Sequence, residues 1–228
     1  MVSPMHKSTQ VQTITIDGPA GAGKSTVAKE LAQRLGFFYL DTGAMYRALT
    51  LKAIRSGMNL EDAQGLMDLA RRTKLRLENH SGGTKVLLDG EDVSEAIRSL
   101  EVTNKTFYIA RAGGVREIMV GWQRDIGARQ SIVIEGRDVG TVVFPKASHK
   151  FYLDADFEER ARRRIKELRE KGKQVDEDSL KKELKERDHK DFTRSVGPLK
   201  VAADAAVIDT TRLTVNTTVD EILKYIKQ

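Results

Sequence analysis

The chain of 228 residues contains no cysteine, and this absence limits its chemistry. A disulfide framework, a cysteine-ligated metal and a catalytic thiol are all excluded. No apolar run approaches the roughly 18–20 residues that a membrane-spanning helix needs. The short polar segment 1–10 does not have the pattern of a secretory signal peptide. These absences lead us to expect a cytoplasmic enzyme with no membrane partner.

Aromatic residues are also scarce. They make up 6% of the chain, which leaves little material for stacking nucleic-acid bases. The net charge of +6 is typical of a protein that binds either nucleic acid or small polyanions such as nucleotides. In the most charged segment, 157–194, acidic residues interleave with basic ones, so no clean positive stripe results. We therefore expect small-molecule partners and no nucleic acid.

The strongest motif is the segment 18–25, which matches the P-loop pattern G-x-x-x-x-G-K-[ST]. Residues 11–17 predict a strand before it, and apolar spacing in 26–35 predicts a helix after it. Glycines let backbone N–H groups point inward around phosphate, and the helix start adds its positive dipole end. Lys24 is expected to reach the β and γ phosphates, and Ser25 to offer its hydroxyl to Mg²⁺. The alternative, a glycine turn without a ligand, fits this complete match poorly.

The remaining pattern predicts an α/β fold with a central parallel sheet. Further strands are predicted at 37–40, 131–135, 150–153 and 205–209, with helices at about 44–56, 115–127 and 219–226. Ligands bind such sheets at the carboxyl ends of the strands, where Asp41 and Thr42 stand. Segment 157–194 predicts two helices broken near Gly172. It is either a solvated helix pair or a mobile lid whose arginines close over phosphates.

Between residues 58 and 112 the alternating rhythm stops, which indicates an insertion on the core. A helix is predicted at 60–72, and two strands at 74–77 and 85–88 joined by a turn at 80–83. Asp89 and Gly90 predict a second turn. We expect a short helix over 93–100 and another over 102–111, which Gly113 and Gly114 interrupt.

Five arginines stand out by their positions after strands or in the charged segment. They are Arg47, Arg116, Arg137, Arg187 and Arg194. Arginine holds phosphate with two parallel hydrogen bonds and keeps its charge, so several arginines around one site would suit phosphoryl transfer. From spacing alone, a solvated surface position is the commoner outcome for each of them.

Five motifs in order along nearly the whole chain resemble those of bacterial cytidylate kinases. They lie at residues 18–25, 40–47, 88–93, 135–145 and 186–194. The resemblance implies a single domain, 1–228, with a three-layer P-loop fold. It also implies an insertion that binds the nucleoside monophosphate (NMP) at about 58–112 and a helical lid at about 157–194. The implied activity is ATP-dependent phosphorylation of CMP and dCMP, with Mg²⁺, by a monomer.

The resemblance also implies which residues form the site. ATP is expected at Gly18, Pro19, Ala20, Gly21, Ala22, Gly23, Lys24, Ser25 and Thr26, with Arg163 and Arg164 over its phosphates. The acceptor nucleotide is expected at Asp41, Thr42, Arg47, Arg116, Arg137, Asp138, Arg187, Asp191 and Arg194. Lys24, Arg47, Arg137 and Arg187 are expected to act in catalysis, and Ser25 at the metal. The sequence departs from the family pattern at Phe107, where a serine often helps to read the base.

Three alternatives follow from the same residues. One is another small-molecule P-loop kinase, of the UMP or shikimate type. A GTP-binding switch is suggested by residues 104–107, Asn-Lys-Thr-Phe, but Phe107 replaces the aspartate that the guanine motif requires. A nucleic-acid-binding protein is suggested only by the basic isoelectric point of about 9.4.

Overall fold

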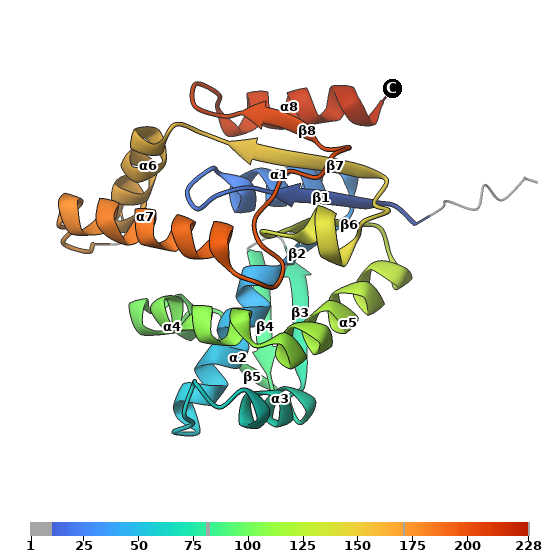
Figure 1. The fold of residues 1–228 in the computed structure, drawn as a ribbon. Helices are drawn as coiled ribbons and strands as arrows, with labels where there is room; N and C mark the ends of the chain where they lie inside the picture. The colour runs from blue at the N-terminus through green and yellow to red at the C-terminus, as the bar shows by residue number, and fades with distance from the viewer. Residues whose placement is uncertain (1–10, 81–82, 171, 228) are drawn as a thin grey trace, which may run out of the picture.

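A five-stranded parallel sheet forms the centre of the computed structural model, which describes residues 11–80, 83–170 and 172–227 (Figure 1). The strand order is β2-β6-β1-β7-β8. The strands are β1 (Thr13–Asp17), β2 (Phe38–Asp41), β6 (Ile132–Glu135), β7 (His149–Asp154) and β8 (Ala206–Asp209). The α/β class and the parallel sheet are as predicted from the sequence.

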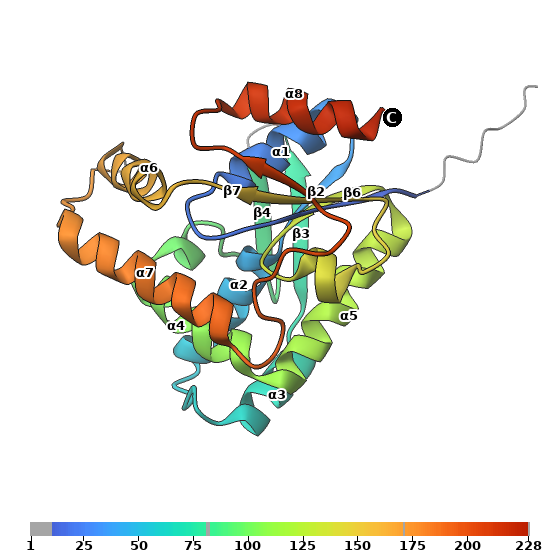
Figure 2. The ribbon, with the colours of Figure 1, turned by 45° about the horizontal axis from the view of Figure 1, so that its top comes forward.

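Helices cover both faces of this sheet and make three layers (Figure 2). On one face Ile14 and Ile16 of β1 pack against α1 (Lys24–Leu35) and α8 (Val215–Ile226). On the other face Ile132 and Ile134 of β6 pack against α2 (Thr42–Arg55) and α5 (Gly113–Arg129). Successive residues of a strand point to opposite faces, so two-sided burial explains the nearly continuous apolar runs in these strands.

Each of the five parallel strands ends in an acidic residue, and all five ends lie at the same edge of the sheet. These residues are Asp17, Asp41, Glu135, Asp154 and Asp209. Two of them organise the chain that follows. Asp41 accepts the N–H of Ala44 (2.8 Å) and so caps α2, a known role for an aspartate at a helix start. The buried Asp17 accepts the N–H groups of Val139 (2.8 Å) and Gly140 (2.7 Å). It thereby holds a π-helical turn, η2 (Val139–Val143), which follows β6 after residues 136–138.

The segment that the sequence marked as an insertion forms a second, three-stranded antiparallel sheet. It contains α3 (Ala63–Arg71), β3 (Leu75–His80), β4 (Gly83–Leu88) and β5 (Glu91–Asp92). The predicted turn at 89–90 is confirmed, since Asp89 and Gly90 adopt φ values of 52° and 94° between β4 and β5. The predicted 80–83 connection includes residues 81–82, which lie outside the described residues.

Three local predictions were wrong. Residues 93–100 form only a 3₁₀ turn, η1 (Ala96–Arg98), because Ser99 is extended and caps α4 (Leu100–Arg111). The break after α4 falls at Ala112, and Gly113 begins α5 instead of interrupting a helix. Gly114 has a packing role, because a Cβ there would lie 2.5 Å from the sulfur of Met67 on α3. Helix α8 begins four residues earlier than predicted, where Thr214 forms a capping box.

The charged segment forms two helices, α6 (Phe157–Glu170) and α7 (Glu177–Thr193), which lie side by side at the carboxyl end of the sheet (Figures 1 and 2). Gly172, with φ of 72°, lies between them, so the predicted break is confirmed. None of the helices described is both long and apolar enough to span a bilayer.

Candidate active site

The glycine-rich loop, residues 18–23, connects the carboxyl end of β1 to the start of α1. Gly18, Gly21 and Gly23 have φ values of 147°, 80° and 85°, which other residues adopt only with strain. A Cβ at Gly18 would lie 2.0 Å from the carbonyl oxygen of Leu153, so glycine also permits close approach to β7. The first turn of α1 contains no acidic residue. The loop therefore presents backbone N–H groups and a positive helix end to an anion.

Lys24 and Ser25 stand at the start of α1; Lys24 contacts the loop, and Ser25 contacts the end of β6. The buried ammonium of Lys24 donates to the carbonyl of Pro19 at 2.6 Å. Burial and the nearby charge of Arg137 lower the pKa of Lys24 to about 7. The hydroxyl of Ser25 donates to Oε1 of Glu135 at 2.7 Å. Ser25 and Thr26 are exposed, so both hydroxyls can reach a ligand in the loop.

Glu135 is a site residue that the sequence reasoning missed. It is buried at the end of β6, beside the loop, and burial together with the charge of Asp41 raises the pKa of its carboxyl. The available signal was an acidic residue that ends a buried strand. The oxygens of Ser25 and Glu135 are hard donors, which suit Mg²⁺. Across the described part of the chain no three metal-ligating side chains group together, so phosphate and water would complete its coordination.

Five basic side chains from five segments converge beside the loop, and we call them the cationic cluster. They are Lys24, Arg47, Arg137, Arg164 and Arg187. They lie close enough for the charge of Arg137 to act on both Lys24 and Arg187, and for those of Arg47 and Arg164 to act on Arg187. The sequence proposed all five as site residues, and the fold brings them together.

Carboxylates balance this cluster only in part. Nε of Arg137 donates to Asp191 at 2.6 Å, and Nη2 of Arg47 donates to Asp41 at 3.1 Å. The guanidinium of Arg187 has no hydrogen-bond partner among the described residues, and the residue is exposed to solvent. Crowding by protein atoms and the charge of Arg137 lower the pKa of Arg187 to about 10, so it stays charged at neutral pH. The result is an excess of positive charge open to an incoming anion.

The other predicted arginines form a separate group, which we call the Asp138 cluster. Nη2 of Arg116 donates to one carboxylate oxygen of Asp138, and Nη2 of Arg194 donates to the other at 3.2 Å. Arg116 also donates to the hydroxyl of Tyr46 at 3.3 Å. The side chains of Arg116, Asp138 and Arg194 are at most 9% exposed. Their geometry is thus fixed before any ligand binds.

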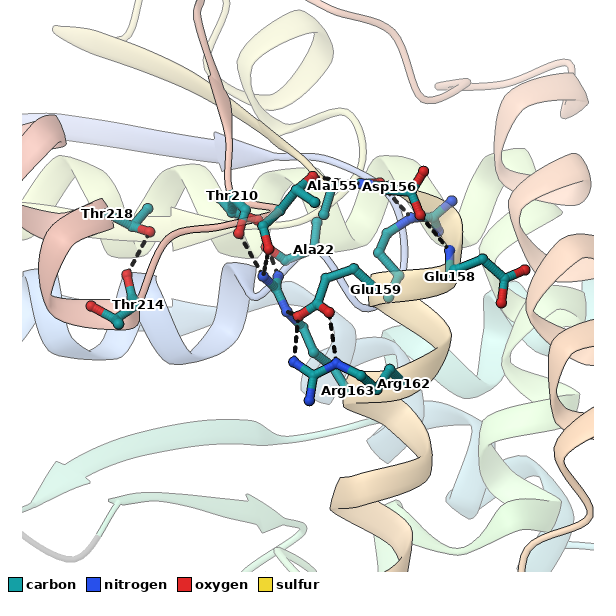
Figure 3. A network of polar contacts seen from close by, with 12 residues as sticks. Ala22, Ala155, Asp156, Glu158, Glu159, Arg162, Arg163, Thr210, Thr214 and Thr218 are labelled. Carbon is teal, nitrogen blue, oxygen red and sulfur yellow. Dashed lines mark hydrogen bonds and ion pairs between the residues drawn. The ribbon is translucent and has the colours of Figure 1, made fainter.

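The two predicted lid arginines point to different places. Arg163 turns toward the glycine loop (Figure 3), where its guanidinium donates to the hydroxyl of Thr210 (3.1 Å) and to its carbonyl (2.5 Å). Thr210 in turn donates to the carbonyl of Ala22 at 3.1 Å. Arg164 pairs with Glu167 at 2.6 Å, and its charge acts on Arg187. Arg163 therefore borders the loop, and Arg164 belongs to the cationic cluster.

The hydroxyl of Thr42, a predicted acceptor-binding residue, makes a hydrogen bond inside the protein. It is buried at the start of α2 and donates to the backbone carbonyl of Glu135 at 2.8 Å. This bond ties α2, and with it Arg47, to the end of β6. The Thr42 side chain thus lies at the edge of the site, where its hydroxyl bonds to the protein backbone.

Comparison with known proteins decides between the families that such a site allows. The family model described as cytidylate kinase matches residues 14–228. The chain belongs to the cytidylate kinase family. A cytidylate kinase from Desulforamulus reducens is 50% identical over 222 residues, covering 96% of this chain and 99% of the relative. One from Pelotomaculum thermopropionicum is 51% identical over 211 residues, covering 92% and 93%.

Solved structures show how widely the fold of this cytidylate kinase family member is shared. Shikimate kinase from Bacteroides thetaiotaomicron matches with a TM-score of 0.50 at 14% identity, covering 95% of this chain and 99% of that one. An uncharacterized protein from Eubacterium ventriosum matches with a TM-score of 0.52 at 15% identity, covering 96% and 99%. At such low identity these likenesses show the P-loop kinase fold alone. The resemblance read from the five motifs is confirmed by the family match.

Proposed function

We propose that this protein transfers the γ-phosphoryl group of ATP to the 5′-phosphate of CMP, and of dCMP, to give ADP and the diphosphate. One observation carries the proposal beyond family membership. The cationic cluster gathers basic side chains from α1, α2, α6, α7 and the turn after β6 around one glycine loop. Two phosphate groups that must meet in line repel each other, and such a cluster neutralises both.

In the proposed reaction an oxygen of the acceptor phosphate attacks the γ phosphorus, and the bond to the β,γ-bridging oxygen breaks. No general base is needed, since the acceptor phosphate is already an anion near neutral pH. Residues 18–26 hold the donor, with Lys24 at its β and γ phosphates, and Arg47, Arg137 and Arg187 hold the acceptor phosphate. Ser25 and Glu135 would hold Mg²⁺, which would supply positive charge to the phosphates. Positioning and electrostatics supply the rate.

The Asp138 cluster supports a role in reading the cytosine base. Both oxygens of Asp138 have arginine partners, so the carboxylate keeps one orientation. Asp191, beside the acceptor site, is proposed to contact the sugar. We propose the segments 58–112 and 157–194 as the NMP-binding insertion and the lid. We further propose that the enzyme works as a cytoplasmic monomer on free nucleotides.

A coupled ADP-release assay tests this function, with ATP and Mg²⁺ and with CMP, dCMP, UMP, AMP and GMP offered separately. We expect rapid turnover with CMP and dCMP, and little with AMP or GMP. Turnover of UMP equal to that of CMP would show that base selection by the Asp138 cluster is relaxed. The absence of turnover with every monophosphate, alongside tight ATP binding, would overturn the proposed function.

A further inference from the structure

One peptide group of the glycine loop is held by two side chains from outside the loop. Nη1 of Arg160, on α6, donates to the carbonyl oxygen of Ala20 at 2.9 Å. The N–H of Ala20 points to Oδ1 of Asp188, on α7, at 3.4 Å. Arg160 and Asp188 also pair with each other at 2.5 Å. A single ion pair therefore occupies both polar backbone groups of Ala20.

This contact is buried and supported by packing. The side chains of Arg160 and Asp188 are 10% and 11% exposed. Nε of Arg160 donates to the carbonyl of Ala155 at 3.1 Å, just after β7, so the pair also reaches the central sheet. A Cβ on Gly21 would lie 3.0 Å from both Cβ and the carbonyl oxygen of Arg160, which brings the loop backbone directly against α6.

The pair lies within one helical turn of the residues on α6 and α7 that face the site. Arg163 and Arg164 follow Arg160 by three and four residues, and side chains at that spacing share a helix face. Arg187 adjoins Asp188 on α7, and Asp191 follows it by three residues. Fixing Arg160 and Asp188 against the loop thus fixes the rotation of both helices about their axes.

We propose that Arg160 and Asp188 are positioning residues that couple the glycine loop to α6 and α7. They hold the loop backbone in its phosphate-binding shape, and they aim the arginines of both helices at the bound phosphates. The proposal rests on the proposed function only for the nature of the ligand, a nucleoside triphosphate. A purely structural ion pair is the competing explanation.

An apolar replacement separates positioning from stability, since a buried ion pair can often be replaced by apolar residues at little cost in stability. We would compare wild type with the double variant Arg160→Met/Asp188→Leu. The matched control is Arg169→Gln/Glu177→Gln, because this exposed pair (2.7 Å) joins the same two helices away from the loop. The readouts are the Kd for ATP by calorimetry without acceptor, kcat, and the melting temperature.

We expect the double variant to melt within a few degrees of wild type while its Kd for ATP rises about tenfold and kcat falls about tenfold or more. The control variant should keep wild-type values throughout. A folded double variant with native ATP affinity and kcat would overturn the proposal. If that variant fails to fold, Asp188→Asn keeps the side-chain shape and is expected to weaken ATP binding about threefold; native affinity there would overturn the proposal instead.

The calorimetric readout keeps this test apart from the proposed function. If wild type binds ATP but phosphorylates no monophosphate, the proposed function fails, and the comparison of Kd values still decides the role of the pair. If wild type binds no ATP, both proposals fall together.

Discussion

The cationic cluster and the Asp138 cluster lie at the same edge of the sheet but balance their charges in different ways. Both carboxylate oxygens of Asp138 already have arginine partners, and the three side chains are almost fully buried. In the cationic cluster basic groups outnumber the carboxylates beside them, and Arg187 stands open to solvent. An anion must complete the cationic cluster, whereas in the Asp138 cluster both carboxylate oxygens are already paired without a ligand. The cationic cluster therefore suits the binding of a charged group, and the Asp138 cluster suits the orientation of a polar ligand.

The largest expected effect on activity comes from the cationic cluster. Arg137→Ala or Lys24→Ala should lose at least about 3 kcal/mol of transition-state stabilisation, because each removes a charge that the transferring group needs. Steady-state kcat/KM for CMP measures this loss. Arg129→Ala is the matched control, since Arg129 is exposed at the end of α5, in a different region of the fold. Near-native turnover in either site variant would remove that residue from the proposed mechanism.

Loss of a carboxylate should lower the free energy of unfolding more in the Asp138 cluster than in the cationic cluster. Asp138→Asn leaves Arg116 and Arg194 buried without their counter-charge, and should lower the free energy of unfolding by about 2 kcal/mol. Asp191→Asn should cost less than about 1 kcal/mol, because Arg137 and Asp191 are more accessible to water, at 16% and 17% exposed. Urea unfolding of both variants measures the two losses. Equal losses, or the reverse order, would contradict the contrast between the clusters.

In the cationic cluster, we expect a substitution of Lys24 that abolishes activity to increase stability. The pKa of Lys24 is lowered from 10.5 to about 7 in the folded protein, so folding opposes its charged form. The unfolded chain binds the extra proton, and the resulting cost to stability is complete below pH 7 and disappears as pH rises toward 10.5. Lys24→Met removes this cost and should raise the free energy of unfolding by at least about 1 kcal/mol at pH 7.

Unfolding of the nucleotide-free protein as a function of pH checks this prediction. The difference between Lys24→Met and wild type should be constant below about pH 6 and shrink as pH rises from about 7 to 10. A matched substitution of an exposed lysine, Lys227→Met, should show no such trend, because Lys227 is solvated at the end of α8. A variant that is less stable than wild type at pH 7 would show that the Lys24 ammonium stabilises the empty loop.

The sequence predicted the parts of the fold that depend on local pattern. The P-loop with its flanking strand and helix, the parallel strands and the break at Gly172 follow from periodicity and from glycine placement. The misplaced elements depend on tertiary contacts. Gly113 and Gly114 look like helix breakers in one dimension, but Gly114 lets α5 approach Met67 closely. The π-helical turn exists because Asp17, 122 residues away, accepts its first N–H groups.

For the site, the sequence supplied the residues but not their grouping. It gave no signal that Arg116 and Arg194 share Asp138, because these contacts join residues 22 and 56 positions apart. Arg160 and Asp188 also escaped notice, since in sequence they are two more charges in a helix pair rich in charge. Which charges meet is decided by the packing of α5, α6 and α7 around the sheet, and periodicity carries no information on that packing.

Phe107 lies on α4 and gives the smallest expected effect. Nζ of Lys190, on α7, and the guanidinium of Arg111 each lie 5.4 Å from the centre of its ring. Phe107→Leu keeps the apolar volume but removes the ring face, and an exposed contact of this kind contributes about 0.5–1 kcal/mol. We expect the KM for CMP to rise less than about threefold, with kcat and the CMP-to-UMP ratio of kcat/KM unchanged. Lys190→Ala should reproduce that small rise if the contact between the Phe107 ring and the Lys190 ammonium causes it. A change of tenfold or more in the CMP-to-UMP ratio for Phe107→Leu alone would mean that the ring reads the base, so that the selective surface extends from the Asp138 cluster onto α4.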